Sequence, residues 1–187
     1  MKIQRMISME FLGTAILAVA IVGSGHMAIN LQADSGMVLL INALATAIGL
    51  ALVIRIGMKV SGSHFNPAVT LVMLMLKKIT PQLSLFYITA QVVGAITGVG
   101  FANLLFDQKA LDQSSIERSG SNLFFSEIFA TAVLLWIILR FPKRDDLIAV
   151  YVPLWIFGAI LFTSSTSFAN PAITIGRIFT NSVVGIA

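Results

Sequence analysis

The chain contains no cysteine and very few charged residues. Of its 187 residues only 11% are charged and 57% are hydrophobic. Without cysteine, disulfides, thiol catalysis and thiolate metal sites are excluded. Several uncharged runs approach the roughly 20 residues that a helix needs to cross a bilayer. This composition predicts a helical protein with several membrane spans rather than a soluble all-α protein with an apolar core.

Recognisable catalytic patterns are also missing. The sequence offers no nucleophile–base set and no phosphate-binding glycine loop, and its two histidines are too few for a convincing metal cluster. We therefore expect no enzyme activity and no cofactor. The net charge of +4 does not indicate a nucleic-acid partner, because the basic residues flank the apolar runs. That placement is typical of topology signals, which makes the lipid bilayer the expected partner.

Hydropathy divides the chain into long and short apolar segments. We expect membrane spans at about 7–27, 37–57, 81–106, 124–141 and 148–166. The first of these has no small-residue cleavage site, so we interpret it as a span rather than a signal peptide. Two further segments, at about 66–76 and 170–181, are too short to cross. Residues 107–121 are expected to form a polar loop and 142–146 a turn.

The basic residues are divided unevenly between the two sides of the predicted membrane. With the N-terminus inside, nine Lys and Arg residues fall on the cytoplasmic side and three, Lys109, Arg118 and Arg177, on the outer side. Positive residues are enriched on the cytoplasmic side of membrane proteins. The sequence thus predicts an integral protein of the plasma (inner) membrane with a cytoplasmic N-terminus.

The two halves of the chain resemble each other. The segment MEFLGTAILAVAI at 9–21 matches SEIFATAVLLWII at 126–138, and Asn-Pro-Ala occurs twice, 104 residues apart, each time after the second span of its half. This predicts an internal repeat, about 1–106 and about 122–187, within a single transmembrane domain over 1–187. Three spans per half would invert the second copy. Since the second half contains only two, we expect a sixth transmembrane helix to be missing from this chain.

The repeated motif has a clear local meaning. Asn is a strong N-cap and Pro fits the first helical position, so each copy predicts the start of a short helix. Such a helix can enter a membrane partway if its backbone lines a wet cavity. Two N-termini that face one point would disfavour cations, while the Asn amides would donate to a passing oxygen. We expect these groups to meet at a narrow waist suited to small neutral molecules: Asn66, Pro67, Ala68, Asn170, Pro171 and Ala172.

Three stretches together carry a family resemblance. SGSHFNPAVTL at 61–71, AQVVGAITG at 90–98 and NPAITIG at 170–176 closely resemble the aquaporin and glycerol-facilitator family of major intrinsic proteins. The resemblance covers the whole chain. It implies an all-α membrane channel: an inverted repeat with two re-entrant Asn-Pro-Ala half-helices, assembled as a homotetramer with one passive pore per subunit.

The resemblance also implies supporting roles for residues near the re-entrant loops. Glu10 and Glu127 would accept backbone N–H groups from these loops, which would account for carboxylates within apolar spans. The alternative is that both are interfacial residues near span ends. We expect His64 to orient its loop or to line the inner vestibule rather than to bind a metal or relay protons.

The predicted selectivity filter departs from the family pattern. The family usually places Arg after the second Asn-Pro-Ala, where this chain has Ile173; the other filter positions would be Gly158, Ser167 and either Thr46, by spacing, or Ile48, by matching GLALV. These residues predict a wide filter that passes glycerol-like polyols, urea and undissociated metalloid acids such as arsenite. TSSTSFANPAITI also resembles bacterial aquaglyceroporins associated with arsenic resistance.

Arg177 lies one helical turn beyond Ile173 and on the same face, so we place it at the outer mouth. It is either a displaced positive barrier or an interfacial Arg that reaches toward lipid headgroups. Three other functions stay open: a water-selective aquaporin, an ion-coupled secondary transporter, and a structural or adhesive membrane protein with an occluded pore. A coupled transporter would need acidic residues near the substrate, and the only candidates are near span starts.

Overall fold

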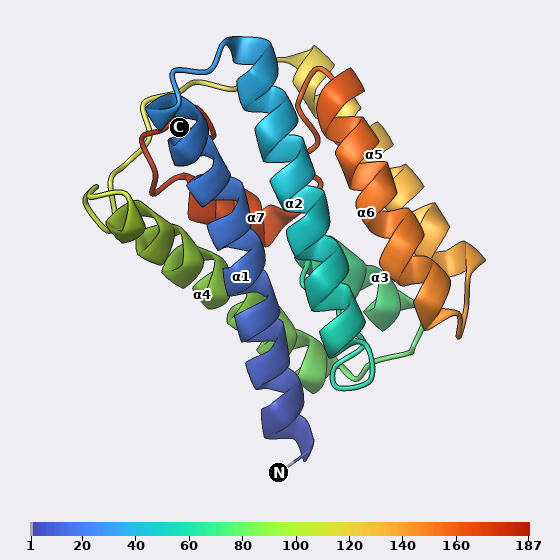
Figure 1. Cartoon of the computed structure of the whole chain (residues 1–187). Coiled ribbons are helices and arrows are strands. Elements are labelled where there is room, and N and C mark those ends of the chain that lie inside the picture. Colours follow the sequence, from blue (N-terminus) through green and yellow to red (C-terminus); the bar gives the residue numbers. More distant parts are fainter. Residues whose placement is uncertain (1) are drawn as a thin grey trace.

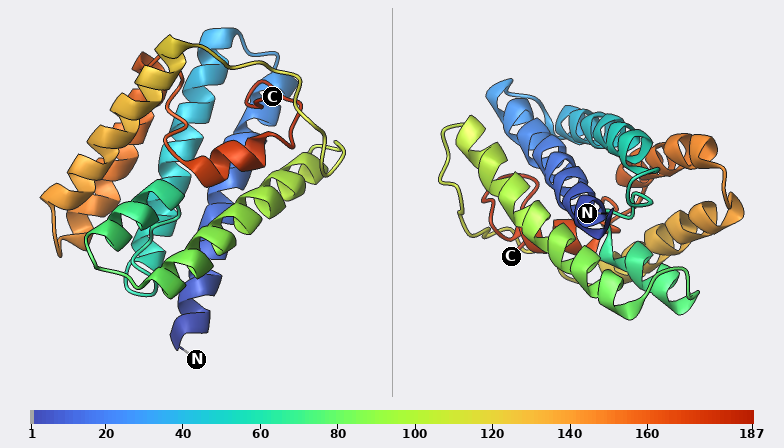
Figure 2. Two further views of the ribbon diagram at one scale, coloured as in Figure 1. Left: turned by 180° about the vertical axis from the view of Figure 1, so that it is seen from behind. Right: turned by 90° about the horizontal axis from the view of Figure 1, so that it is seen from below.

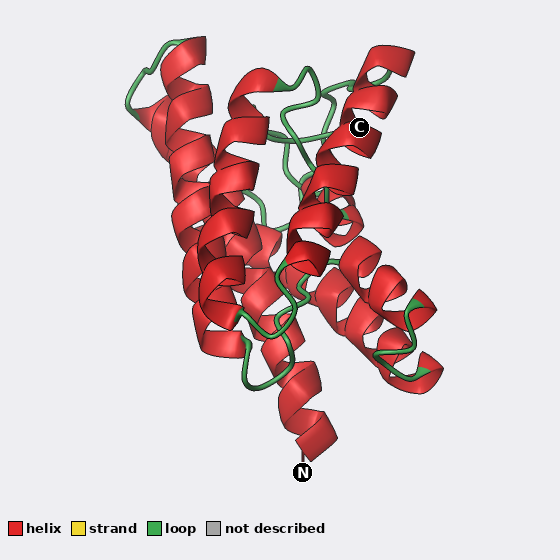
Figure 3. Ribbon diagram, turned by 90° about the vertical axis from the view of Figure 1, so that its right-hand side faces the viewer, coloured by secondary structure: helices red, strands yellow, loops and turns green. Residues whose placement is uncertain are grey.

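A computed structural model describes residues 2–187, and within this range it contains helices and loops but no strand (Figure 3). Five helices are long and apolar enough to cross a membrane, which confirms the five predicted spans. They are α1 (Lys2–Asn30), α2 (Ser35–Gly57), α4 (Pro81–Leu105), α5 (Ser121–Arg140) and α6 (Asp145–Phe162). Two helices are too short to cross: α3 (Pro67–Met75) and α7 (Pro171–Arg177).

The long helices form a bundle around the two short ones. Helix α1 packs against α2 and α4, α2 packs against α6, and α6 packs against α5. Helices α3 and α7 contact each other inside this frame, and each also packs against α4 (Figures 1 and 2). The N-terminus and the C-terminal segment lie toward opposite ends of the bundle (Figure 1).

Helices α1 and α4 approach each other closely because α4 has glycine where they cross. A Cβ atom at Gly94 would clash with the carbonyl oxygen of Phe11, and one at Gly98 would clash with that of Ala15. Small residues four apart allow two helix backbones to come together in this way. The close packing of α1 and α4 therefore depends on the absence of side chains at Gly94 and Gly98.

Helix α6 ends earlier than the hydropathy predicts. The expected span runs to residue 166, whereas the helix ends at Phe162 and an irregular segment follows. The carboxylate of Glu127 on α5 accepts hydrogen bonds from the N–H groups of Phe168 and Ala169 in this segment, which supplies acceptors for its non-helical backbone. Three of its residues have positive φ angles: Thr166, Ser167 and Ala169. Helix α7 is likewise shorter than predicted and ends at Arg177.

The surface of the bundle is apolar and much of its polar chemistry is internal. Large hydrophobic side chains such as Leu12, Phe101 and Phe129 are more than half exposed, while Glu10 and Gln91 are fully buried. In lipid, polar groups must find partners within the protein, and apolar groups can face outward. This distribution is typical of a membrane protein, in which the polar residues lie in the interior of the bundle.

Candidate functional site

The two Asn-Pro-Ala motifs begin the two short helices. The Oδ1 atom of Asn66 accepts from the N–H of Ala68 at 2.8 Å. The Oδ1 atom of Asn170 accepts from the N–H of Ala172 at 3.1 Å and of Ile173 at 3.4 Å. In both helices a proline occupies the first helical position: Pro67 and Pro171. Each asparagine thus satisfies orphan donors at its own helix start.

The same asparagines tie the two helix starts together. The Nδ2 atom of Asn66 donates to the carbonyl oxygen of Ala169 at 2.7 Å, and that of Asn170 donates to the carbonyl oxygen of Phe65 at 2.8 Å. The bonds are reciprocal: each helix start holds the loop that precedes the other. The N-termini of α3 and α7 consequently meet inside the bundle, where their dipoles create a positive potential.

Glu10 anchors the loop before α3. Its Oε1 atom accepts from Ser61 Oγ at 2.5 Å and from the N–H of His64 at 3.0 Å. Its Oε2 atom accepts from the N–H of Phe65 at 2.6 Å and from Gln91 Nε2 at 2.8 Å. Two of these partners are backbone N–H groups, which can only donate, and each contacts a different carboxylate oxygen, so both oxygens of Glu10 are needed as acceptors.

Glu127 has the corresponding place before α7. Its two oxygens accept from the N–H groups of Phe168 at 2.9 Å and Ala169 at 2.6 Å. Because a peptide is planar and trans, each N–H that points at a glutamate turns the preceding carbonyl the other way. Four carbonyl groups are turned from the glutamates in this manner, and their residues line a cavity: Ser63, His64, Ser167 and Phe168.

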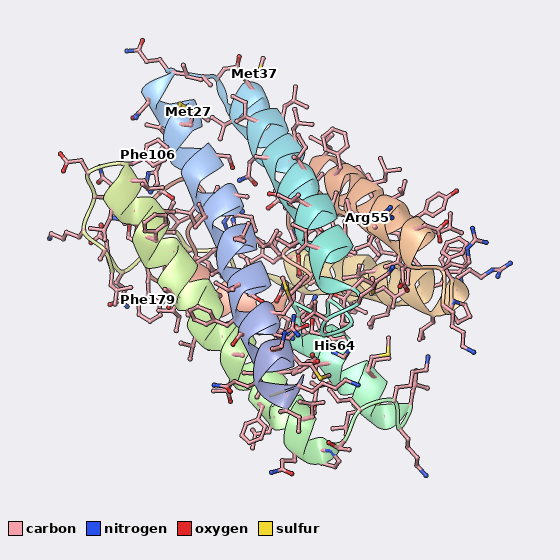
Figure 4. All side chains as sticks on the ribbon, turned by 60° about the horizontal axis from the view of Figure 1, so that its bottom comes forward. Met27, Met37, Arg55, His64, Phe106 and Phe179 are labelled. Carbon is pink, nitrogen blue, oxygen red and sulfur yellow. The ribbon has the colours of Figure 1, made fainter. Side chains whose placement is uncertain are left out.

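The side chain of His64 also holds its loop in place. Its Nδ1 atom lies 3.0 Å from Thr70 Oγ1, and its ring meets the Tyr87 ring edge to face at a centroid distance of 5.3 Å. His64 belongs to the connection between α2 and α3, where Figure 4 labels it, and it is one of the residues that line the cavity. Within residues 2–187 no group of three or more metal-ligating side chains is close enough to hold an ion.

A cavity of about 520 Å³ runs past the paired helix starts. Its walls are mainly aliphatic and come from α1, α2, α3, α5, α6 and α7. Lys78 and Lys143 lie at the end near α3, and Arg177 lies at the end near the C-terminal segment. The polar residues between these ends are Asn42, Thr46, Ser63, His64, Asn66, Thr166, Ser167 and Asn170.

The structure brings some of the expected filter residues together and separates others. Thr46, Ser167 and Ile173 line the cavity and are at most 5% exposed. Ile48 is 61% exposed and is not a lining residue. Residues two apart on a helix point in nearly opposite directions, so only one of the two α2 candidates can face inward. Gly158 is not a lining residue either, and a Cβ atom there would lie 3.3 Å from the ring of Phe162.

The hydroxyl groups of Thr46 and Ser167 are the notable polar atoms of this region. Both are buried, and neither has a hydrogen-bond partner among the described residues. A buried hydroxyl without a partner is costly unless water or a ligand supplies one. Because both residues line the cavity, these oxygens can pair with a molecule inside it.

Several residues that shape the site were missed by the sequence analysis. Asn42 lines the cavity and donates to the carbonyl oxygen of Ile21 at 2.8 Å and to Ser24 Oγ at 3.0 Å. Gln91 supports Glu10 from α4. A usable signal existed for both, because an amide side chain in an apolar span marks an internal position. No such signal existed for Phe168, whose ring contacts Arg177.

Arg177 is enclosed rather than directed toward lipid. It is 5% exposed, its Nε atom donates to the carbonyl oxygen of Val184, and its guanidinium carbon lies 3.6 Å from the centroid of the Phe168 ring. The side chain lines the cavity one turn beyond Ile173.

Comparison with known proteins agrees with this architecture. The family model described as "Major intrinsic protein" matches residues 1–167. Aquaglyceroporin AqpS of Rhizobium meliloti (strain 1021) is 42% identical over 178 residues, which cover 95% of this chain and 76% of AqpS. Glycerol uptake facilitator protein-like 6 of Lactiplantibacillus plantarum is 32% identical over 183 residues, with 89% and 80% covered.

A solved structure has the same fold. The X-ray structure of the aquaglyceroporin from Plasmodium falciparum superposes with a TM-score of 0.68 at 25% sequence identity, covering 94% of this chain and 77% of that one. Members of the matched family are membrane channels that act on small solutes, so the protein is a channel and not an enzyme. The sequence match, the five spans and the helical architecture together place this chain in the major intrinsic protein family.

Proposed function

We propose that this protein is a passive channel for water and small neutral solutes: glycerol-like polyols, urea and undissociated metalloid acids such as arsenite. The observation that carries the proposal is the environment of Ile173, which lines the cavity next to the paired helix starts. An aliphatic side chain at this position leaves a wide passage with little polarity. The named relatives, an aquaglyceroporin and a glycerol uptake facilitator, support the same solute class.

In this proposal α3 and α7 are re-entrant half-helices of an inverted repeat, and the reciprocal asparagine bonds mark the waist of the pore. Each asparagine amide uses one N–H on the opposite loop and has a second to donate to a passing oxygen. The positive ends of the two helices disfavour cations at the same point. A neutral hydroxylic molecule can accept a hydrogen bond from the asparagines and is not repelled by the helix ends.

Wall groups suit such a molecule on either side of the waist. The turned carbonyls of the two loops accept hydrogen bonds, and the unpartnered hydroxyls of Thr46 and Ser167 can accept or donate. We assign these two residues and Ile173 to the selectivity filter, with Glu10, Glu127 and His64 holding the loops that carry the waist. Aliphatic walls elsewhere offer no strong site at which a solute would be retained.

The membrane setting is part of the proposal. The distribution of basic residues supports a cytoplasmic N-terminus in the plasma (inner) membrane, which puts Lys78 and Lys143 at the inner mouth and Arg177 at the outer mouth. As in the family, the assembly would be a homotetramer with a separate pore in each subunit.

The test is solute flux through liposomes that contain the protein. Stopped-flow light scattering would follow shrinkage and re-swelling in gradients of glycerol, urea and arsenite, beside water alone. We expect solute uptake well above that of empty liposomes, and uptake that falls in Ile173→Arg, because the guanidinium would narrow the passage. Water flux without solute uptake would favour a water-selective channel. Uptake that required a proton or sodium gradient would favour a coupled transporter.

A further inference from the structure

Two arginines share one aromatic ring at the end of the cavity near the C-terminal segment. The guanidinium carbon of Arg177 lies 3.6 Å from the centroid of the Phe168 ring, and that of Arg118 lies 5.5 Å from it. Three separate segments therefore meet here: α7, the loop between α6 and α7, and the loop between α4 and α5. Phe168 and Arg177 both line the cavity.

Backbone carbonyls of the C-terminal segment fix both guanidinium groups. Arg177 donates through Nε to the carbonyl oxygen of Val184. Arg118 donates through Nε to the carbonyl oxygen of Gly185 at 3.2 Å and through Nη2 to that of Val183 at 2.9 Å. Held by neutral acceptors and by a ring face, the two groups keep fixed positions without losing their charge.

No carboxylate among the described residues forms an ion pair with either arginine. Partial burial lowers the pKa of Arg118, but an arginine side chain keeps its proton at physiological pH. Two positive charges thus lie at one mouth of the cavity, and at least one of them faces it. The terminal nitrogens of Arg177 have no acceptor among the described residues, so they are available to whatever enters.

We propose that Arg177, held by the Phe168 ring and the carbonyl oxygen of Val184, is the residue that excludes cations from the outer mouth of this pore. Ile173 makes the passage wide and carries no charge, so size alone would not reject a small organic cation there. A fixed guanidinium in a poorly solvated site repels a cation more strongly than it would in water. Neutral solutes feel no such barrier. The inference rests on the proposed channel function and specifies how that function stays selective.

Urea and guanidinium provide the test, because they are planar, similar in size and different in charge. Uptake of each radiolabelled compound would be followed in liposomes containing the full chain. For the wild type we expect urea uptake and almost no guanidinium uptake. In Arg177→Gln, which keeps a hydrogen-bonding side chain but removes the charge, we expect the guanidinium-to-urea ratio to rise at least about tenfold. Urea uptake should change by less than about twofold, since Ile173, which sets the width of the passage, is unchanged in this variant.

Two further variants separate charge from structure. Arg177→Lys keeps the charge, so its ratio should stay close to that of the wild type. Arg140→Gln removes another arginine that lies over a phenylalanine ring, Phe141, but is exposed and does not line the cavity. Its ratio should be unchanged. An Arg177→Gln ratio equal to that of the wild type, or an equal rise in Arg140→Gln, would overturn the inference.

The wild type alone also tests the idea, whether or not the variants fold. Guanidinium uptake as fast as urea uptake would overturn the cation barrier and leave the channel function intact. Water flux without urea uptake would mean that the passage is too narrow for urea, so that size and not charge would exclude guanidinium. That result would also overturn the inference. Uptake of neither water nor urea would overturn the proposed function, and the inference with it.

Discussion

Replacement of Glu10 by glutamine tests whether a single buried carboxylate holds the first re-entrant loop. Glu10 is 0% exposed and accepts four hydrogen bonds, two on each oxygen. The side chains of Ser61 and Gln91 can turn to accept instead of donate, but the N–H groups of His64 and Phe65 cannot. Since these two backbone donors contact different oxygens, an amide in place of the carboxylate leaves one of them facing an NH₂ group.

The expected loss of stability in Glu10→Gln follows from the number of hydrogen bonds that are affected. One buried backbone N–H loses its acceptor and the remaining bonds lose their charge assistance, which together cost about 2–4 kcal/mol. Glu10→Gln should lower the free energy of unfolding by this amount, measured by SDS titration in mixed micelles. The loop carries Phe65, whose carbonyl accepts from Asn170, so glycerol uptake in liposomes should fall as well.

Glu127→Gln is the matched control. Glu127 accepts two backbone N–H groups, one on each oxygen, and is only partly buried. Water can reach an incompletely buried donor, so we expect a loss of about half that of the first variant. Unchanged stability and uptake in Glu10→Gln would refute the reasoning, as would a larger loss in Glu127→Gln, because burial would then not set the cost.

Three other substitutions test packing, the filter and the waist. Gly98→Leu should prevent α1 and α4 from approaching, because its side chain would overlap the carbonyl of Ala15, and the variant should show greatly reduced thermal stability in detergent. Thr46→Ala should alter glycerol and urea uptake rates by at least about twofold while Ile48→Ala leaves them unchanged; equal effects would mean that the rotation of α2 is not as described. Asn66→Asp should weaken the bond to the opposite loop and place negative charge at the waist, so a pH-sensitive dye inside the liposomes should report faster proton entry; an unchanged rate would argue against a barrier at the helix starts.

Local chemistry made much of the architecture predictable. Crossing helices are recognised by the length and hydropathy of a segment, both of which are contained in the segment itself, and all five spans were found in this way. The starts of α3 and α7 were predictable for a similar reason. An asparagine cap followed by proline acts on the next few residues only, so Asn66 and Asn170 needed no distant partner to be identified.

Positions that depend on distant contacts were less predictable. Helix α6 ends at Phe162, and the irregular segment that follows is held by Glu127, on a different helix, which accepts hydrogen bonds from the N–H groups of Phe168 and Ala169. Hydropathy has no access to such a contact, and it extended the span to residue 166. Gly158 was assigned to the filter by counting back from Asn170, and it is not among the residues that line the cavity.

The sequence by itself determined the membrane-spanning class, the number of spans in this chain, the paired motif and the aliphatic residue that follows it. Tertiary structure alone decided that Thr46 rather than Ile48 faces the cavity, and that Arg177 lies against Phe168 instead of reaching toward lipid. The physical reason is the range of the interactions. Hydrophobicity and helix capping act within a few residues, whereas the rotation of a helix and the burial of a charge depend on segments that the chain brings together only when it folds.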